Sequence, residues 1–173
     1  MKRLFYLLAA AAFTACGSAT TLSVMTFNMR YDNPEDGADN WRFRRGRVAE
    51  VIASHGVDVF GTQELLANQL GDLKRLLPGY AAVGVGREDG AEAGEFSAVF
   101  YRRDRFTPLE SGTFWLSETP DVAGSKGWDG ACERVATWVV LHDREGGREF
   151  LFVNTHLDHV CLLYTSPSPR DCS

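Results

Sequence analysis

Cysteine is scarce in this chain, and positive charge is not in excess. Of the four cysteines, one lies near the N-terminus and two lie near the C-terminus, which leaves Cys132 alone in the interior. A disulfide framework is therefore excluded for the interior. Lysine and arginine total 18 against 23 acidic residues, a formal net charge of −5. This balance lacks the basic footprint of a protein that grips long nucleic acid. It does not exclude a nuclease, because bound cations change the local field.

Long apolar runs are missing as well, apart from one at the N-terminus. Met1 to Ala19 combines two cations with an apolar stretch from Leu4 to Phe13 and small residues after it. This pattern predicts an export signal that is too short to span a membrane. Cys16 lies in a sequence that resembles a lipoprotein box, so lipidation of Cys16 and ordinary cleavage after Ala19 are both open. We expect a periplasmic, cell-surface or secreted protein.

The C-terminal residues 161–173 do not follow the pattern of the rest. Cys161 to Asp171 resembles one translated reading frame of a transposase sequencing adapter, and a native tail rich in serine and proline is the alternative. We expect the natural sequence to be interrupted near Val160. Residues 161–173 are therefore left out of the fold prediction.

Between these ends, the chain first alternates strands with helices. Thr21 to Phe27 reads as a strand, a helix begins at Trp41 and stops at Gly56, and Val57 to Glu64 reads as a second strand. The second helix is predicted from leucines at helical spacing, namely Leu66, Leu70, Leu73 and Leu77. Strands separated by turns follow, and they are Ala81 to Val85, Ser97 to Tyr101, Arg134 to Leu141 and Glu149 to Thr155. The sequence shows no internal repeat and no second domain.

Three of these strands end in polar side chains with chemical potential. Asn28 follows the first strand, Glu64 closes the second and His156 follows the last. In open α/β sheets the functional residues lie beyond the carboxyl ends of the strands. We therefore expect these three side chains to meet at one rim of the fold.

Glu64 has two interpretations. A carboxylate at the end of a buried strand is costly to ionise unless it is paired or bound to a metal. Mg²⁺ binds one or two such carboxylates together with phosphate oxygens of the substrate. The alternative is a helix N-terminal anion, because a helix is predicted to begin just after Glu64 and its dipole favours a negative charge.

His156 lies in the run from Asn154 to His159, close to Asp158 and a second histidine. Along a continued strand, His156 and Asp158 would share one face and His159 would take the other, so a transition-metal site built from these residues alone is disfavoured. The functional interpretation is an imidazole that donates to a phosphate oxygen. A core histidine satisfied by the backbone is the alternative.

The remaining candidates are weaker from their own sequence context. Asn28 is either functional or a turn former, and Arg134 is either a phosphate clamp or an edge-strand cation. Glu95 is isolated, and nothing in its neighbourhood marks it.

Together, however, these segments resemble the endonuclease/exonuclease/phosphatase superfamily. The resemblance extends from Leu22 to Val160, and its matching motifs are Thr26-Phe27-Asn28, Gly61-Thr62-Gln63-Glu64, Val99-Phe100-Tyr101-Arg102 and Asn154-Thr155-His156-Leu157. The family fold is a four-layer α/β sandwich, in which two mixed sheets pack face to face with helices outside. Residues 20–160 would then be the N-terminal part of that domain, about half of it.

The resemblance also implies a function, namely in-line attack of activated water on a phosphate ester with help from Mg²⁺ or Mn²⁺. It implies that Glu64 binds the cation and that Asn28 helps to organise the cation or phosphate. His156 would stabilise charge on the phosphoryl oxygens, Arg134 would contact phosphate, and Glu95 would orient His156. The implied partner is a phosphate-ester substrate, either nucleic acid, sugar phosphate or phospholipid head group. No protein partner is implied, and we expect a monomer that contacts membrane only through a lipid on Cys16.

Two features of the sequence depart from the family pattern. The Asn28-Met29-Arg30 segment lacks the acidic residue that the apurinic-site branch carries two positions after its asparagine. The later Asp-x-Asn and Asp-His pairs of the family, which complete the metal site and supply the general base, are not in the chain. We expect the sequence as given to be inactive. An exported binding lipoprotein that keeps the sandwich without catalysis is the competing interpretation.

Overall fold

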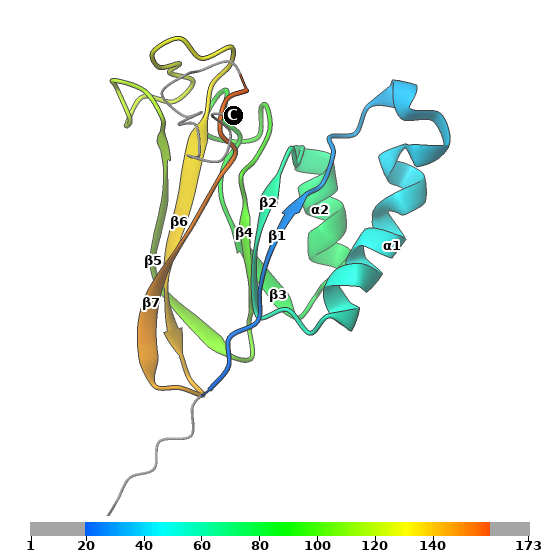
Figure 1. The fold of residues 1–173 in the computed structure, drawn as a ribbon, viewed down its shortest axis with the longest axis vertical. Helices are drawn as coiled ribbons and strands as arrows, with labels where there is room; N and C mark the ends of the chain where they lie inside the picture. Colours follow the sequence, from blue (N-terminus) through cyan, green and yellow to red (C-terminus); the bar gives the residue numbers. More distant parts are fainter. Residues whose placement is uncertain (1–19, 160–173) are drawn as a thin grey trace, which may run out of the picture.

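The computed structural model describes residues 20–159, which form two facing β-sheets with helices on one side (Figure 1). The predicted signal segment with Cys16 and the predicted adapter-derived tail lie outside these residues. The four-stranded sheet has the order β1-β2-β4-β3, and the three-stranded sheet has the order β5-β6-β7. The two helices cover the outer face of the first sheet. Helices, first sheet and second sheet are thus three successive layers of the predicted α/β sandwich.

The strands and helices follow the predicted order, with two additions, the short 3₁₀ helix η1 and the strand β5. Their bounds are β1 Val24–Asn28, η1 Pro34–Asp39, α1 Trp41–Ser54, β2 Val59–Gln63, α2 Ala67–Leu76, β3 Tyr80–Val83, β4 Val99–Arg102, β5 Phe106–Trp115, β6 Val135–Asp143 and β7 Arg148–Thr155. The long strand β5 was not predicted, because its middle is exposed and carries no run of buried side chains. Within residues 20–159, neither helix is long and apolar enough to cross a membrane.

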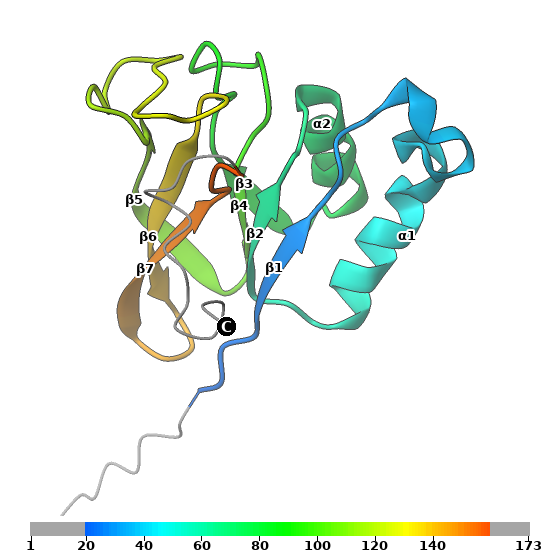
Figure 2. The ribbon, with the colours of Figure 1, turned by 45° about the horizontal axis from the view of Figure 1, so that its top comes forward.

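Strand direction brings the functional ends together. β1 and β2 are parallel, with Asn28 opposite Gln63, so their carboxyl ends are level. The crossover between them runs through α1. Asn40 is the N-cap of this helix, and its side chain accepts a hydrogen bond from Arg42 N–H (3.2 Å). The helix ends at Ser54, and Gly56 follows it with a φ of 57°, which suits a residue without a side chain. β7 points toward the same end of the molecule as β1 and β2 (Figures 1 and 2).

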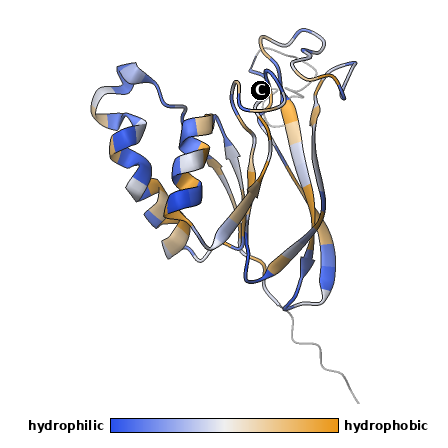
Figure 3. Cartoon of the chain, turned by 180° about the vertical axis from the view of Figure 1, so that it is seen from behind, coloured by the Kyte–Doolittle hydropathy of each residue, from blue (hydrophilic) through white to orange (hydrophobic). Residues whose placement is uncertain are grey.

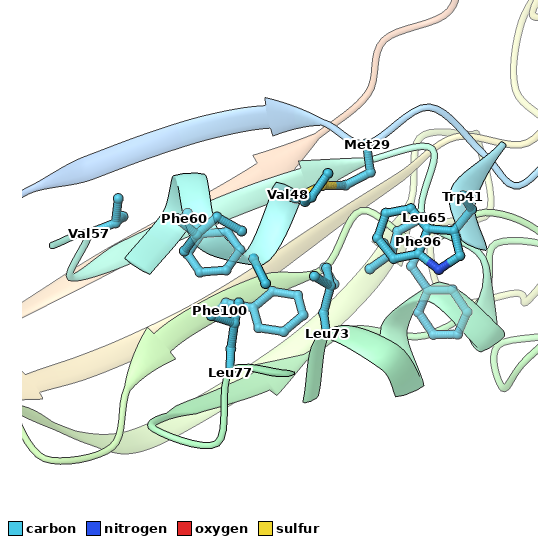
Figure 4. Close-up of a cluster of buried hydrophobic side chains, with 13 residues drawn as sticks. Met29, Trp41, Val48, Val57, Phe60, Leu65, Leu73, Leu77, Phe96 and Phe100 are labelled. Atoms are coloured by element: carbon cyan, nitrogen blue, oxygen red, sulfur yellow. The ribbon is translucent and has the colours of Figure 1, made fainter. Parts of the chain in front are cut away.

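The larger core lies between the helices and the first sheet. Phe60 and Phe100 stack there with ring centroids 4.7 Å apart, and both are fully buried. Trp41, Leu65 and Leu73 close the same cluster near the functional end (Figure 4). A second cluster, which includes Val59, Val99 and Leu141, lies between the two sheets. The helix ribbons carry many hydrophilic residues (Figure 3). Burial of each large side chain stabilises the fold by about 1.5–3 kcal/mol.

A buried ion-pair cluster fastens the two sheets at the opposite end. Arg105, which is 4% exposed, donates to Asp143 (2.8 and 3.1 Å) and to Asp58 (2.8 Å). Asp58 immediately precedes β2 in the first sheet, while Asp143 ends β6 in the second. The turn from Arg144 to Gly147 then returns the chain as β7, and the antiparallel β6–β7 pairing confirms the predicted hairpin.

Candidate active site

A pocket of about 340 Å³ lies where β1, β2 and β7 end. We call it the rim pocket, and its lining residues are Arg30, Tyr31, Glu64, Arg87, Glu95, Cys132, Arg134, His156 and His159. Four of the predicted site residues, Glu64, Glu95, Arg134 and His156, are among them. The fifth, Asn28, does not line the pocket but donates a hydrogen bond to Glu64, which does. The predicted convergence at one rim is therefore what the fold produces.

The ends of β2 and β7 are held in register by Asn154. Its side-chain amide donates to the carbonyls of Thr62 (2.8 Å) and Ala98 (3.1 Å), and its oxygen accepts from Gln63 Nε2 (2.8 Å). These bonds are buried between the two sheets. They therefore fix the position of Glu64, the residue after Gln63, relative to His156, which lies two residues after Asn154.

Glu64 occupies an unusual backbone position. Its φ is 58°, in the left-handed region that a non-glycine residue rarely adopts. The carboxylate accepts from Asn28 Nδ2 (2.9 Å) and from Tyr31 N–H (3.4 Å), which are both neutral donors. Within residues 20–159, no salt bridge reaches it. A strained residue that presents an unpaired carboxylate to a pocket is typical of a functional site.

The alternative interpretation of Glu64 as a helix-terminal anion finds less support. Helix α2 begins at Ala67. The backbone amide of its N-cap residue, Leu66, donates to the side chain of Gln69 (3.0 Å) and not to Glu64. The hydrogen bonds of Glu64 go to β1 and the loop after it. The side chain is thus aimed away from the helix terminus and into the rim pocket.

The side chain of Asn28, at the end of β1, makes hydrogen bonds to Glu64 and to Arg30. Its Nδ2 donates to Glu64, and its Oδ1 accepts from Arg30 N–H (2.9 Å). The contact with Glu64 makes Asn28 a residue that positions the carboxylate. The amide oxygen keeps a second lone pair, so the expected role of Asn28 beside the cation stays a prediction.

His156 and Arg134 contact each other directly. Arg134 Nη1 lies 3.3 Å from His156 Nδ1, and the arginine is only 6% exposed. Burial lowers the pKa of the His156 imidazole, and the charge of Arg134 lowers that pKa further. The carboxylates of Glu64 and Glu95 act in the opposite sense. The arrangement gathers a guanidinium and an imidazole, two groups suited to anionic oxygens.

Glu95 is placed in the same pocket but has a different partner. Its carboxylate accepts from Arg87 Nη1 at 2.7 Å. The ring nitrogen of His156 that contacts a protein side chain faces Arg134. Orientation of His156 by Glu95 therefore stays a prediction, and the charge of Glu95 reaches the imidazole through space.

The rim pocket also contains residues that sequence reasoning did not select. Arg30 and Tyr31 follow Asn28 closely, and Arg87 enters from the loop before β4. His159 lines the pocket together with His156. The expectation that His159 would face away is wrong, because β7 ends at Thr155 and strand alternation no longer applies beyond it. A basic residue two positions after a strand-end asparagine was the available signal for Arg30.

Groups of three or more histidine, cysteine, aspartate or glutamate side chains that could hold a metal ion are absent from residues 20–159. Glu64 nevertheless fits a hard cation, because its carboxylate has only neutral donors and faces an open polar pocket. Mg²⁺ needs few protein carboxylates when substrate and water supply the other oxygens.

The fold is an α/β sandwich of two sheets with a polar pocket at the carboxyl ends of its strands, which is an arrangement typical of α/β enzymes. The sequence profile of the Endonuclease/Exonuclease/phosphatase family matches residues 25–171, and the chain belongs to this family. The predicted resemblance is thereby confirmed. Relatives in this family act on phosphoric esters, and by their names they include a phosphatase and an exoribonuclease.

Solved structures agree with this assignment. The endonuclease/exonuclease/phosphatase from Bacteroides vulgatus is 49% identical with a TM-score of 0.81, over 82% of this chain and 54% of that one. A mannosyl-6-phosphatase from Bacteroides thetaiotaomicron is 48% identical with a TM-score of 0.79, over 82% and 53%. Among curated proteins, the CCR4-Not complex 3'-5'-exoribonuclease subunit Ccr4 of Aspergillus clavatus is 25% identical over 91% of this chain and 27% of its own length. The chain spans about half the length of the similar structures.

Proposed function

We propose that the full-length protein containing this sequence is a divalent-metal-dependent phosphate-ester hydrolase that uses in-line attack of activated water. One observation supports this above all. The carboxylate of Glu64, which lacks a cationic partner within residues 20–159, lines the same pocket as Arg134 and His156. A site for a cation and a site for an anion are thus adjacent, as a metal-bound phosphate group requires.

In this proposal, separate residues bind the cation and the phosphate group. Glu64 would hold Mg²⁺ or Mn²⁺, with Asn28 fixing the carboxylate through its amide. When bound, the cation supplies Lewis-acid polarisation of the phosphoryl group. Arg134 and His156 donate to phosphoryl oxygens and stabilise the charge that develops on them. Preorganised donors in a partly buried site cost little reorganisation, which is the physical basis of the rate gain.

Sugar phosphates are the substrate class that we favour. The support is the 48% identity to a mannosyl-6-phosphatase, together with the acidic balance of the chain. Long nucleic acid needs an extended basic surface, and the net charge of −5 disfavours one. The rim pocket offers three arginines and two histidines in a compact space instead. Export, with or without a lipid on Cys16, is part of this proposal.

The sequence as given is proposed to be inactive by itself. Exposed apolar side chains remain on its strands, including Leu151 (59% exposed), Val153 (50%) and Val24 (54%). Such surfaces favour association in the absence of a cover. The general base of the family is also expected downstream of Val160. Purified residues 20–160 should show no metal-dependent hydrolysis, and robust activity of that segment would contradict this.

The proposal is tested with the full-length parent, recovered by reading the genomic DNA across Val160. The purified protein is assayed against hexose 6-phosphates, a 5'-nucleotide, a phosphodiester and single-stranded DNA, with Mg²⁺, with Mn²⁺ and after removal of metal by EDTA. We expect EDTA-sensitive release of inorganic phosphate from hexose 6-phosphates. Metal-dependent cleavage of only the diester or DNA would retain the reaction class and reject the substrate. Hydrolysis of none of these, with substrate binding intact, would favour the non-catalytic binding protein.

A further inference from the structure

Asp158 is a fully buried carboxylate that contacts Arg134, one of the residues lining the rim pocket. Its side chain is 0% exposed, and its Oδ2 accepts from the backbone amides of Ala131 (3.1 Å) and Cys132 (3.3 Å). The same oxygen accepts from Arg134 Nε at 3.3 Å. A buried charge persists only when it is paired and hydrogen-bonded. Through Oδ2, Asp158 therefore joins the loop before β6 to the segment after β7.

Arg134 is held at two points by this arrangement. Its Nε contacts Asp158, and its Nη1 contacts His156 Nδ1 at 3.3 Å. The guanidinium is planar and rigid, so two contacts fix its orientation. With 6% exposure, the side chain has little room to rotate. The position of Asp158 thus sets which edge of Arg134 meets the imidazole.

The contact with Arg134 has a chemical consequence for His156. Arginine carries only donors and does not lose its proton in proteins. His156 Nδ1 must therefore be the acceptor in this contact, which leaves the single proton of the neutral ring on Nε2. Burial and the charge of Arg134 lower the pKa of His156, which agrees with a neutral ring.

We infer that Asp158 is a positioning residue that acts through Arg134 to hold His156 as the neutral Nε2–H tautomer, with Nε2–H as the donor to a phosphoryl oxygen. This inference deepens the proposed function and rests on it. In this arrangement the charges of Glu95 and Glu64 raise the pKa of the imidazole through space, while the hydrogen bond from Arg134 selects its tautomer. Asp158 itself never touches the substrate.

The tautomer is measured first in the unmodified full-length parent, so no variant needs to fold for this step. Histidine labelled with ¹⁵N is observed by long-range ¹H–¹⁵N correlation at pH 7.5, and His156→Gln assigns the resonance. We expect an unprotonated Nδ1 and a protonated Nε2. A protonated Nδ1, or a ring protonated on both nitrogens, would overturn the inference whatever the catalytic activity is.

Variants then test the role of Asp158. Asp158→Asn keeps the size of the side chain but weakens its hold on Arg134, and Arg134→Lys replaces the two-point contact by a single ammonium. Each should populate the Nδ1–H tautomer and lower kcat by about tenfold, and the double variant should lose little more than the worse single one. Asp121→Asn, at an exposed position in the same loop region, is the matched control and should match the parent.

The outcomes separate this inference from the proposed function. An unchanged tautomer and unchanged kcat in folded Asp158→Asn would remove Asp158 from the positioning role, while metal-dependent hydrolysis by the parent would stand. The expected tautomer in a parent that hydrolyses no phosphate ester would reject the proposed function and leave the Asp158–Arg134–His156 relay without a reaction to serve. If Asp158→Asn fails to fold, Arg134→Lys and the parent spectrum decide the question.

Discussion

Gly61 and Asn154 face each other across the two sheets at contact distance. A Cβ on Gly61 would lie 2.4 Å from Oδ1 of Asn154, closer than any real contact. Asn154 cannot retreat, because its amide is bonded to Thr62, Ala98 and Gln63. The absence of a side chain at Gly61 therefore allows the asparagine to bridge β2 and β7 and to place their ends around the rim pocket.

The first prediction concerns this contact. Gly61→Ala should destabilise the protein by about 1–3 kcal/mol, because the added methyl group overpacks a closed site. The measurement is equilibrium unfolding in urea. Gly46→Ala is the matched control, since nothing lies within 4 Å of its added Cβ in the middle of α1. It should raise stability by about 0.5–1 kcal/mol. Equal effects of the two substitutions would show that the sheets adjust freely at Gly61.

The second prediction concerns Glu64. Glu64→Gln preserves its shape and its contact with the backbone, so folding should survive. Loss of the charge should weaken activation by Mg²⁺ and lower kcat by about 100-fold or more. A titration of initial rate against Mg²⁺ measures both effects. Glu50→Gln removes the same charge from an exposed position on α1 and should leave the titration unchanged. Parental activity of Glu64→Gln at limiting Mg²⁺ would return Glu64 to a structural role.

The third prediction concerns Glu95 and His156. The charge of Glu95 raises the pKa of His156, whereas burial and Arg134 lower it. Glu95→Gln should therefore lower the pKa of His156. Because Glu95 is also predicted to orient the ring, the same variant should reduce kcat/KM by part of what His156→Ala costs. Adding Glu95→Gln to His156→Ala should cost almost nothing more. The values of kcat/KM for both single variants and the double decide the matter. Losses that simply multiply would mean that Glu95 does not act through His156.

The fourth prediction concerns acid stability. Hydrogen bonds from Arg105 lower the pKa of Asp143 from 3.8 to about 2. Because the folded-state pKa is depressed, this stabilisation is complete above pH 4 and is lost as pH falls toward 2. It amounts to about 2 kcal/mol. Unfolding free energies between pH 7 and pH 2 should show this loss, and Asp143→Asn should reduce it. The exposed Asp121→Asn should keep the parental profile, and a profile of Asp143→Asn parallel to the parent would contradict the assignment.

Much of the fold was predictable from local patterns. Apolar β-branched runs predicted β1 and β2, leucine spacing predicted α2, and the Arg144–Gly147 turn predicted the last hairpin. These signals are local, because side-chain burial on one face repeats with the period of the element. The exposed strand β5 escaped prediction for the same reason, since its side chains show no burial pattern over most of its length.

The sequence by itself also determined that Asn28, Glu64 and His156 share one rim, because polar residues at the carboxyl ends of strands converge. Only the tertiary structure decided their partners. It paired Glu95 with Arg87, and it brought Arg134 into contact with both His156 and the buried Asp158. These contacts join residues from loops whose paths depend on packing between two sheets. No local period encodes such contacts, so the chemistry of the rim pocket emerges only when the chain is folded.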